Sequence, residues 1–331
     1  MPDVMTINKV VQCGIEVTPG TQVVATKALK MATLDTGADL TFNIFPGMGR
    51  RFDVATALNQ DMTLAKLGGP FNYTEMVYWL SAIYGTPAIT IPTGATLARQ
   101  WLWNVPLTGS IVPKTLTVEE GDTIQAHKFG YGMLSDIGGK FVRDGECQAE
   151  GAVFGQISTD GITLTGALSG VPQIPVLGKH LSYYLDTTFA GIGVTKYLRV
   201  FDCQWKWGKA FSQAWPMDRS QTSFAAHVDT DPDTEVVLVV ANDTQGVALR
   251  AAARANQTQY LRIEAIGDQI ETGTPNQFYL LNIDMPMRIV KIDPYADHKG
   301  IYAYGVKLRV IEDATFGQGA TIRLVNTQVA L

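Results

Sequence analysis

The feature that most constrains this chain of 331 residues is a degenerate internal repeat. The string Thr-Lys-Ala-Leu-Lys at residues 26–30 returns as Thr-Lys-Tyr-Leu-Arg at residues 195–199, an offset of 169. The string Asn-Tyr-Thr-Glu at residues 72–75 returns as Asn-Asp-Thr-Gln at residues 242–245, an offset of 170. Each match is weak, but their common order and nearly constant offset indicate that residues 15–157 and 184–331 are two copies of one pattern.

Two further matches extend the repeat. Phe52 matches Phe224 at an offset of 172, and Trp-Leu-Trp at residues 101–103 matches Tyr-Leu-Arg at residues 260–262 at an offset of 159. The smaller last offset predicts an insertion in the first copy between its helix and the strand that follows.

The repeat predicts two tandem domains, residues 1–165 and 179–331. A junction at residues 166–178 separates them, within a stretch rich in Ser, Thr, Gly and Pro. Two similar domains in one chain are typical of a component of a larger assembly.

Composition describes a folded protein. Hydrophobic residues make up 46% of the chain and charged residues 17%. The formal net charge of −5 indicates no basic surface for binding nucleic acid or anionic lipid. The N-terminal residues show no signal-peptide pattern, and apolar runs such as residues 236–240 are too short to cross a bilayer. We therefore expect neither secretion nor a membrane location.

Three cysteines, Cys13, Cys147 and Cys203, are widely scattered and odd in number, which suits a reducing compartment without a disulfide framework. Cys203 lies in an apolar strand at the position that matches Leu34. We expect it to be a small buried hydrophobe, not a reactive thiol.

Most segments have the pattern of short strands separated by Gly, Pro or Asp, and each copy has one clear helix. The first helix is predicted at residues 72–84, with Asn72 as its cap, Glu75 at the third position and Gly85 at its end. The second is predicted at residues 243–255, with Asn242 as its cap and Asn256 beyond its end. Each half should be a β structure with a single helix on one face.

Both copies contain a long segment between the first strong strand and the next. In the first copy it covers residues 36–60, and in the second it covers residues 208–234. Such segments carry large apolar side chains and are usually functional, so we predict contacts between subunits or between stacked rings. The alternative is a hairpin arm folded back on its own sheet. The candidate self-assembly residues are Phe42, Ile44, Phe45, Phe52, Phe211, Trp215 and Phe224.

The sequence shows no catalytic signature. It lacks HExxH, CxxC, GxSxG and a phosphate-binding loop, and the glycines at residues 47–49 lack the strand-to-helix context of one. The acidic stretch at residues 229–235 has Thr234 and Val240 where a calcium loop requires Gly and Glu, so it is better explained as a turn before a strand. The four histidines have no ligand spacing. We predict no enzyme activity, no cofactor and no metal site.

Several strings resemble the tail tube, or major tail, proteins of long noncontractile-tailed bacteriophages. The resemblance covers nearly the whole chain, and the segment at residues 204–215 departs from it. The strings that carry it are Gly-Ile-Glu-Val-Thr-Pro-Gly-Thr at 14–21, Thr-Val-Glu-Glu-Gly-Asp at 117–122, Ser-Phe-Ala-Ala-His-Val at 223–228, Leu-Arg-Ile-Glu-Ala at 261–265, Asp-Ala-Thr-Phe-Gly at 313–317 and Val-Asn-Thr at 325–327.

The resemblance implies a β-sandwich or barrel with one flanking helix, whose subunits join their inner sheets into a ring. Stacked rings then form a virion tail tube, assembled in the host cytoplasm, through which duplex DNA passes. The resemblance also implies tape measure, tail terminator and tail-tip proteins as partners. Single-domain members of this family form sixfold rings, so the duplication here predicts a trimer with pseudo-sixfold symmetry.

A channel for DNA should not be basic, because basic groups would hold the phosphates and stall sliding. We therefore predict a net negative lumen. Its candidate residues flank the strands beside the long segments; they are Asp35, Asp39, Asp61, Asp202, Asp233 and Glu235.

Two other classes of protein remain open from the sequence. A two-domain β-sandwich adhesin or receptor-binding module would stay monomeric or form small closed oligomers. A β-rich carbohydrate-active enzyme would need a deep cleft with a pair of carboxylates.

Overall fold

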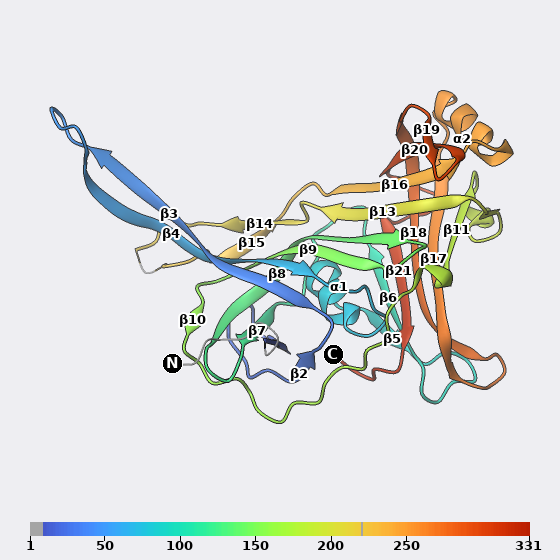
Figure 1. Ribbon diagram of the computed structural model, residues 1–331. Coiled ribbons are helices and arrows are strands. Elements are labelled where there is room, and N and C mark those ends of the chain that lie inside the picture. Colours follow the sequence, from blue (N-terminus) through green and yellow to red (C-terminus); the bar gives the residue numbers. More distant parts are fainter. Residues whose placement is uncertain (1–8, 220) are drawn as a thin grey trace.

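The computed structural model describes residues 9–219 and 221–331. Strands account for 53% of the chain and helical residues for 8%, which confirms the predicted mainly β fold. Figure 1 shows a body of long strands, with a two-stranded hairpin projecting from it at the upper left.

The first half contains a long hairpin followed by one helix and a series of antiparallel strands. Its elements are β1 (Val10–Ile15), β2 (Lys27–Leu29), β3 (Thr33–Pro46), β4 (Asp53–Gly68), α1 (Met76–Tyr84), β5 (Ala88–Thr90), β6 (Arg99–Val105), β7 (Leu116–Gly121), β8 (Ala126–Val142), β9 (Gln148–Gly155) and β10 (Thr159–Asp160).

The 3-10 turn Gly178–His180 leads into the second half, and a second 3-10 turn, Phe189–Gly191, lies between its strands β11 and β12. Its elements are β11 (Leu181–Asp186), β12 (Lys196–Tyr197), β13 (Val200–Gly208), β14 (Phe211–Ala214), β15 (Ala226–Asp229), β16 (Asp233–Ala241), α2 (Thr244–Arg254), β17 (Gln259–Glu271), β18 (Gln277–Ile292), β19 (Ala296–His298), β20 (Ile301–Val310) and β21 (Ala320–Asn326).

The two halves pair their strands in the same order. In the first half the antiparallel order is β2-β1-β7-β8-β9-β4-β3. In the second half it is β12-β11-β17-β18-β20-β16-β13. β10 and β21 also correspond, because each pairs with the long central strand of its half. The sequence repeat is therefore a repeat of strand order.

One of the sequence matches is wrong. Residues 260–262 lie in β17, whose counterpart by pairing is β7 and not the strand of residues 101–103. That strand is β6, which pairs with the short β5 and with β21 of the second half. The insertion predicted in the first copy is thus the whole β5–β6 unit. The two segments matched only because each has an aromatic residue followed by a leucine in a strand.

A continuous sheet crosses from one half to the other. Its order is β3-β4-β9-β8-β13-β16-β20-β18, four strands from each half. The crossing is possible because β8 has 17 residues, so its start pairs with β7 and its end pairs with β13. Cys203 lies opposite Phe141 at this crossing, and both are buried.

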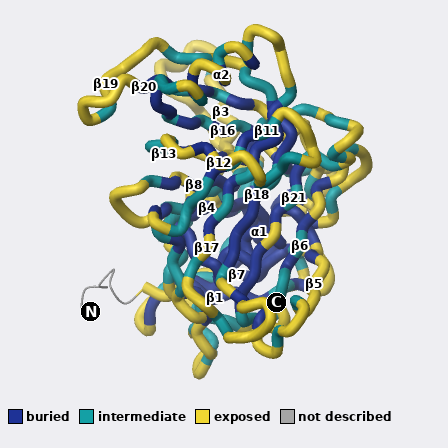
Figure 2. The backbone as a smooth tube through the Cα atoms, turned by 90° about the vertical axis from the view of Figure 1, so that its right-hand side faces the viewer, coloured by how far each residue is buried: buried dark blue, intermediate teal, exposed yellow. Residues whose placement is uncertain are grey.

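The predicted junction at residues 166–178 does not coincide with a break in the core. One cluster of buried apolar residues includes side chains of both halves, and Figure 2 shows the buried positions running through the body. The junction itself is bound to the first half, where Val176 donates its amide to the carbonyl of Phe71 at 2.7 Å. A division into two domains stays a prediction.

The helix α1 is a core element. All nine of its residues are buried, and Tyr84 packs edge-on against Trp207 of β13 with ring centroids 5.2 Å apart. The predicted helix began four residues too early, because Asn72 Oδ1 accepts the amides of Thr74 and Glu75 in a turn that precedes α1. Gly85 ends the helix with a φ of 83°, where a Cβ would lie 2.4 Å from the carbonyl oxygen of Val112.

The helix α2 lies at the periphery, at the upper right of Figure 1. Asp243 caps it by accepting the amide of Gly246 at 3.0 Å, so the predicted cap at Asn242 is wrong by one residue. Asn242 instead accepts a hydrogen bond from Arg250. Asn256 follows the helix as expected and has a φ of 50°, a left-handed conformation that Asn tolerates.

Candidate self-assembly interface

The first long segment is a hairpin arm formed by the outer parts of β3 and β4. It extends away from the body (Figure 1) and does not fold back on its own sheet. Phe42 is opposite Leu58 and Phe45 is opposite Ala55 in its ladder. All four predicted contact residues on this arm are exposed, by 50% for Phe42, 58% for Ile44, 49% for Phe45 and 80% for Phe52. Leu40, Val54 and Leu58 are exposed as well.

The second long segment contains the corresponding hairpin, β14–β15. Phe211 is opposite Asp229 and Ala214 is opposite Ala226. This ladder repeats the one of the first arm pair by pair, so Phe211 corresponds to Phe42. Phe52 and Phe224 also correspond, because each lies just before the second strand of its hairpin.

The second arm is packed against the first half of the same chain. The Phe224 ring lies 5.1 Å from that of Tyr131 and 5.5 Å from that of Phe154. Gln156 Nε2 donates to the Phe224 carbonyl at 3.1 Å, and Ser223 Oγ donates to the Asp61 carbonyl at 2.8 Å. These contacts hold the loop of the second arm against the middle of β4 and the end of β9.

One face of β14–β15 makes the remaining contacts. His227 Nδ1 lies 3.1 Å from the hydroxyl of Tyr131, and Phe211 packs edge-on against His227 at 5.4 Å. Burial lowers the pKa of His227, which favours the neutral imidazole, and the charge of Asp229 opposes this effect. The opposite face, with Ala226 and Val228, is exposed.

The prediction that the second segment offers its aromatic side chains to another subunit does not hold for this chain. Phe211 is 4% exposed and Phe224 is fully buried. Trp215 is half-buried, and its ring lies 6.2 Å from that of Phe224. The physical reason is that the first half provides an apolar surface for them within the same chain. Only the first arm leaves its aromatic groups exposed.

The root of the first arm is fixed by a buried carboxylate. Glu75 accepts the backbone amides of Lys30, Met31 and Ala32 at distances of 2.6 to 3.2 Å, just before β3 begins. Burial raises the pKa of Glu75, and the hydrogen bonds from these amides oppose that rise. The sequence suggested that Glu75 would turn back on its own helix, whereas it holds the chain that leads into β3.

The continuous sheet has two open edges. One is the outer edge of β3, which among the described residues pairs with β4 alone. The other is the end of β18 beyond Met287, where β17 no longer covers it. The counterparts of these edges, β13 and the end of β8, pair with one another at the crossing between the halves. The open edge of β3 could therefore pair with the open end of β18 in another copy, as β13 pairs with β8 within the chain.

The predicted lumen acids fall mostly on one face of this sheet. Residues alternate in direction along a strand, and Leu34, Cys203 and Val236 point into the core. By this alternation the face opposite the core carries Asp35, Asp39, Asp202, Asp233 and Glu235. Asp61 does not belong with them, because it shares its face of β4 with the buried Thr63 and Ala65.

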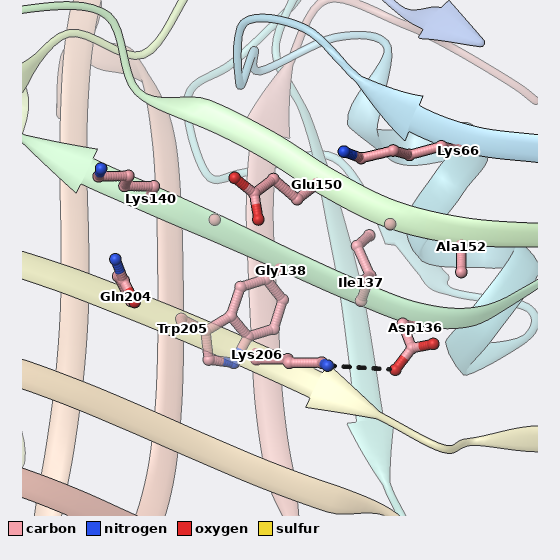
Figure 3. A pocket seen from close by; sticks show the side chains of 12 residues that line it. Lys66, Asp136, Ile137, Gly138, Lys140, Glu150, Ala152, Gln204, Trp205 and Lys206 are labelled. Atoms are coloured by element: carbon pink, nitrogen blue, oxygen red, sulfur yellow. Dashed lines mark ion pairs between the residues drawn. The ribbon is translucent and has the colours of Figure 1, made fainter. Parts of the chain in front are cut away.

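Basic side chains accompany these acids. Lys307 lies 2.7 Å from Glu235, and Arg309 lies 3.2 Å from Asp233. Figure 3 shows the part of the same face at the crossing of the halves, a hollow of about 370 Å³ over Gly138 and Gly151. Lys206 and Asp136 lie 3.7 Å apart within it, and the basic groups Lys66 and Lys140 also line it. The sheet face is thus of mixed charge.

The described part of the chain offers little for other kinds of chemistry. Within residues 9–219 and 221–331, no group of three or more His, Cys, Asp or Glu side chains could hold a metal ion. No helix of the described chain is long and apolar enough to cross a membrane. All three cysteines are buried and unpaired, and burial raises the pKa of each thiol, to about 11 for Cys147.

Neither the models of known protein families nor the curated proteins include a match to this sequence.

Several residues of the interface were not identified from the sequence. Tyr131, Phe154 and Gln156 receive the second arm, but they lie in ordinary strand patterns of the first half. The only local signal was Tyr131 between two glycines, and it has a φ of 56°. Leu40 and Leu58 extend the exposed face of the first arm. The alternation of Leu40, Phe42 and Ile44 could have revealed that strand.

Proposed function

We propose that this protein is the structural subunit of a bacteriophage tail tube and assembles head to tail into rings. The observation that carries the proposal is the pair of open edges on a sheet that already joins two copies of one strand order. Inside the chain, the end of β8 pairs with β13. The same contact between chains would pair the end of β18 with β3 of the next copy.

The register of this contact follows from the internal crossing. Trp207 lies opposite Ile137 in β8. The matching bulges, between Leu134 and Asp136 in β8 and between Ile289 and Lys291 in β18, make Ile292 the counterpart of Ile137. Ala38 is the counterpart of Trp207, because Leu34 and Cys203 occupy the same place in their ladders. Ala38 of one chain should therefore lie opposite Ile292 of the next.

Closure of the ring supplies a partner for each open edge. Exposed strand edges pair indiscriminately with other chains, and a closed sheet removes them. Three chains that each supply two equivalent units would close with pseudo-sixfold symmetry. The face of mixed charge with Asp35, Asp202 and Glu235 would then line the channel. Three basic groups of this face, Lys206, Lys307 and Arg309, lie within 4 Å of acidic side chains, which weakens their attraction for the phosphates of passing DNA.

The experiment is a cysteine cross-link across the proposed contact. We expect the double variant A38C/I292C to form covalent trimers under mild oxidation, because residues directly opposite in an antiparallel pair are close enough for a disulfide. The native cysteines are buried and should not interfere. Electron microscopy of the same sample should show rings or tubes. A purified protein that stays monomeric in both measurements would contradict the proposal and favour an adhesin-like module.

A further inference from the structure

The two arms of this chain have the same hairpin ladder but opposite surroundings. The face of the second arm that packs on the first half carries Phe211, Gln213 and His227. The corresponding face of the first arm carries Phe42, Ile44, Thr56 and Leu58. This face is more apolar than the one already buried in the second arm, yet it is exposed. An exposed apolar face of this size marks a contact surface.

The second arm shows where such a hairpin is received. Just after β9, Gln156 Nε2 donates to the Phe224 carbonyl, and midway along β4 the Asp61 carbonyl accepts a hydrogen bond from the Ser223 hydroxyl. The counterpart of Gln156 in the second half is Ile311: the amide of Gln156 donates to Gly130, and that of Ile311 donates to Pro286, each at 3.0 Å. The counterpart of Asp61 is Pro232, because each lies two residues before a buried threonine, Thr63 or Thr234.

A hollow is present at these counterpart positions. It has a volume of about 370 Å³, and both Ile311 and Pro232 line it. Apolar side chains including Leu107, Trp207 and Val310 form other parts of its wall. Apolar cavities of less than half this volume can hold an aromatic ring. On the first half, the equivalent place is filled by Phe224 of the second arm.

We propose that the first arm docks on the second half of a neighbouring copy of this chain in the same ring, with Phe52 in this hollow. The proposal rests on the proposed function, because the neighbouring copy is the one whose β18 edge pairs with β3. Phe42, Ile44 and Leu58 then cover the end of β20, as the second arm covers the end of β9. Each chain both inserts an arm and receives one.

The charges on the two surfaces support a second copy as the occupant. Arg50 and Arg51 lie at the turn of the first arm, directly before Phe52, and both are exposed. The rim of the hollow carries Asp229, Asp231 and Glu312. Opposite charges at the rim of an interface steer association and fix its orientation.

The test is the double variant F52C/I311C of the full chain, oxidised after assembly. We expect most of the protein to migrate as a covalent trimer on a non-reducing gel. The matched control is F45C/I311C, because Phe45 lies on the opposite face of the arm and should remain uncross-linked. In a second measurement, R50E/R51E should raise the protein concentration needed for assembly about tenfold, and adding D231R/E312R should restore it.

The outcomes separate the two proposals. Rings or tubes that form without the F52C/I311C cross-link, or with equal cross-linking in the control, would overturn the docking of the arm and leave the tube function standing. Absence of assembly in the wild-type protein would overturn both. Cross-linking in F52C/I311C alone, together with rescue by the charge swap, would establish the arm contact.

Discussion

Phe42 and Phe211 occupy the same position in two copies of one hairpin, yet half of Phe42 is exposed whereas Phe211 is buried. The difference arises from what each arm meets. The second arm lies on the first half of its own chain, whereas the first arm extends beyond the body. Matched substitutions in the two arms should therefore have opposite effects on folding and on assembly.

We expect Phe224→Ala to destabilise the folded chain by about 3–5 kcal/mol, because a fully buried ring that contacts Tyr131 and Phe154 would be replaced by a cavity. The corresponding Phe52→Ala should change the free energy of unfolding by less than about 0.5 kcal/mol, because Phe52 is 80% exposed. Denaturant unfolding of the unassembled chain measures both. Equal costs would show that the first arm is buried in its own chain in solution.

The double variant F42S/I44S should prevent assembly without unfolding the chain. Phe42 is 50% exposed and Ile44 is 58% exposed in the free chain. Each of these apolar side chains would contribute roughly 1.5–3 kcal/mol if it became buried on assembly. Circular dichroism should remain that of the wild type while tubes disappear from electron micrographs. Normal tubes would show that this face of the arm is not a contact.

Glu75→Ala should destabilise the chain by roughly 2–4 kcal/mol, because three backbone amides before β3 would lose their acceptor. Glu75→Gln keeps one acceptor oxygen and should cost less. Thermal unfolding of the wild type, Glu75→Gln and Glu75→Ala should give melting temperatures that fall in that order. A wild-type melting temperature in Glu75→Ala would mean that water replaces the carboxylate at the root of the arm.

A pH-dependent contribution to stability is expected from Glu271. Its carboxylate accepts the amides of Thr96, Leu97 and Ala98 and the hydroxyl of Thr96. These bonds, led by that from Ala98, lower its pKa from 4.5 to about 2. A carboxyl group with a lowered folded pKa stabilises the fold above its unfolded pKa, so this contribution is present above about pH 4.5 and is lost between about pH 4.5 and about pH 2.

The measurement is denaturant unfolding of the wild type and of Glu271→Gln across that window. The difference in stability between the two proteins should shrink as the pH falls, because the amide side chain does not titrate. A difference that stays constant from pH 6 to pH 2 would show that the carboxylate is not held by residues 96–98 in solution.

Asp243→Ala should cost about 1 kcal/mol, because Asp243 caps α2 through the amide of Gly246. Asn242→Ala, at the cap position expected from the sequence, should cost less, since Asn242 makes only a partly buried hydrogen bond to Arg250. Chemical denaturation of the two variants compares them directly. A larger loss of stability in Asn242→Ala than in Asp243→Ala would show that Asn242 caps the helix.

The sequence by itself determined the local and periodic features. Its repeat predicted one helix in each half and placed Cys203 where Leu34 lies, and both side chains are fully buried in corresponding ladders. Asn256 and Gly85 ended the helices as expected, because left-handed backbone is a local requirement that Asn and Gly meet. The common strand order of the two halves agrees with the repeat in the sequence.

Tertiary structure alone decided which surfaces are free. Both arms carry aromatic residues, but a side chain is buried only where a distant part of the chain offers it a matching surface. Tyr131 and Gln156 provide that surface for Phe224, whereas the described part of the chain leaves Phe52 80% exposed. The pairing of β8 with β13, and of β6 with β21, likewise depends on contacts between residues far apart in the sequence. Local patterns cannot encode such contacts, because the same alternation suits either neighbour.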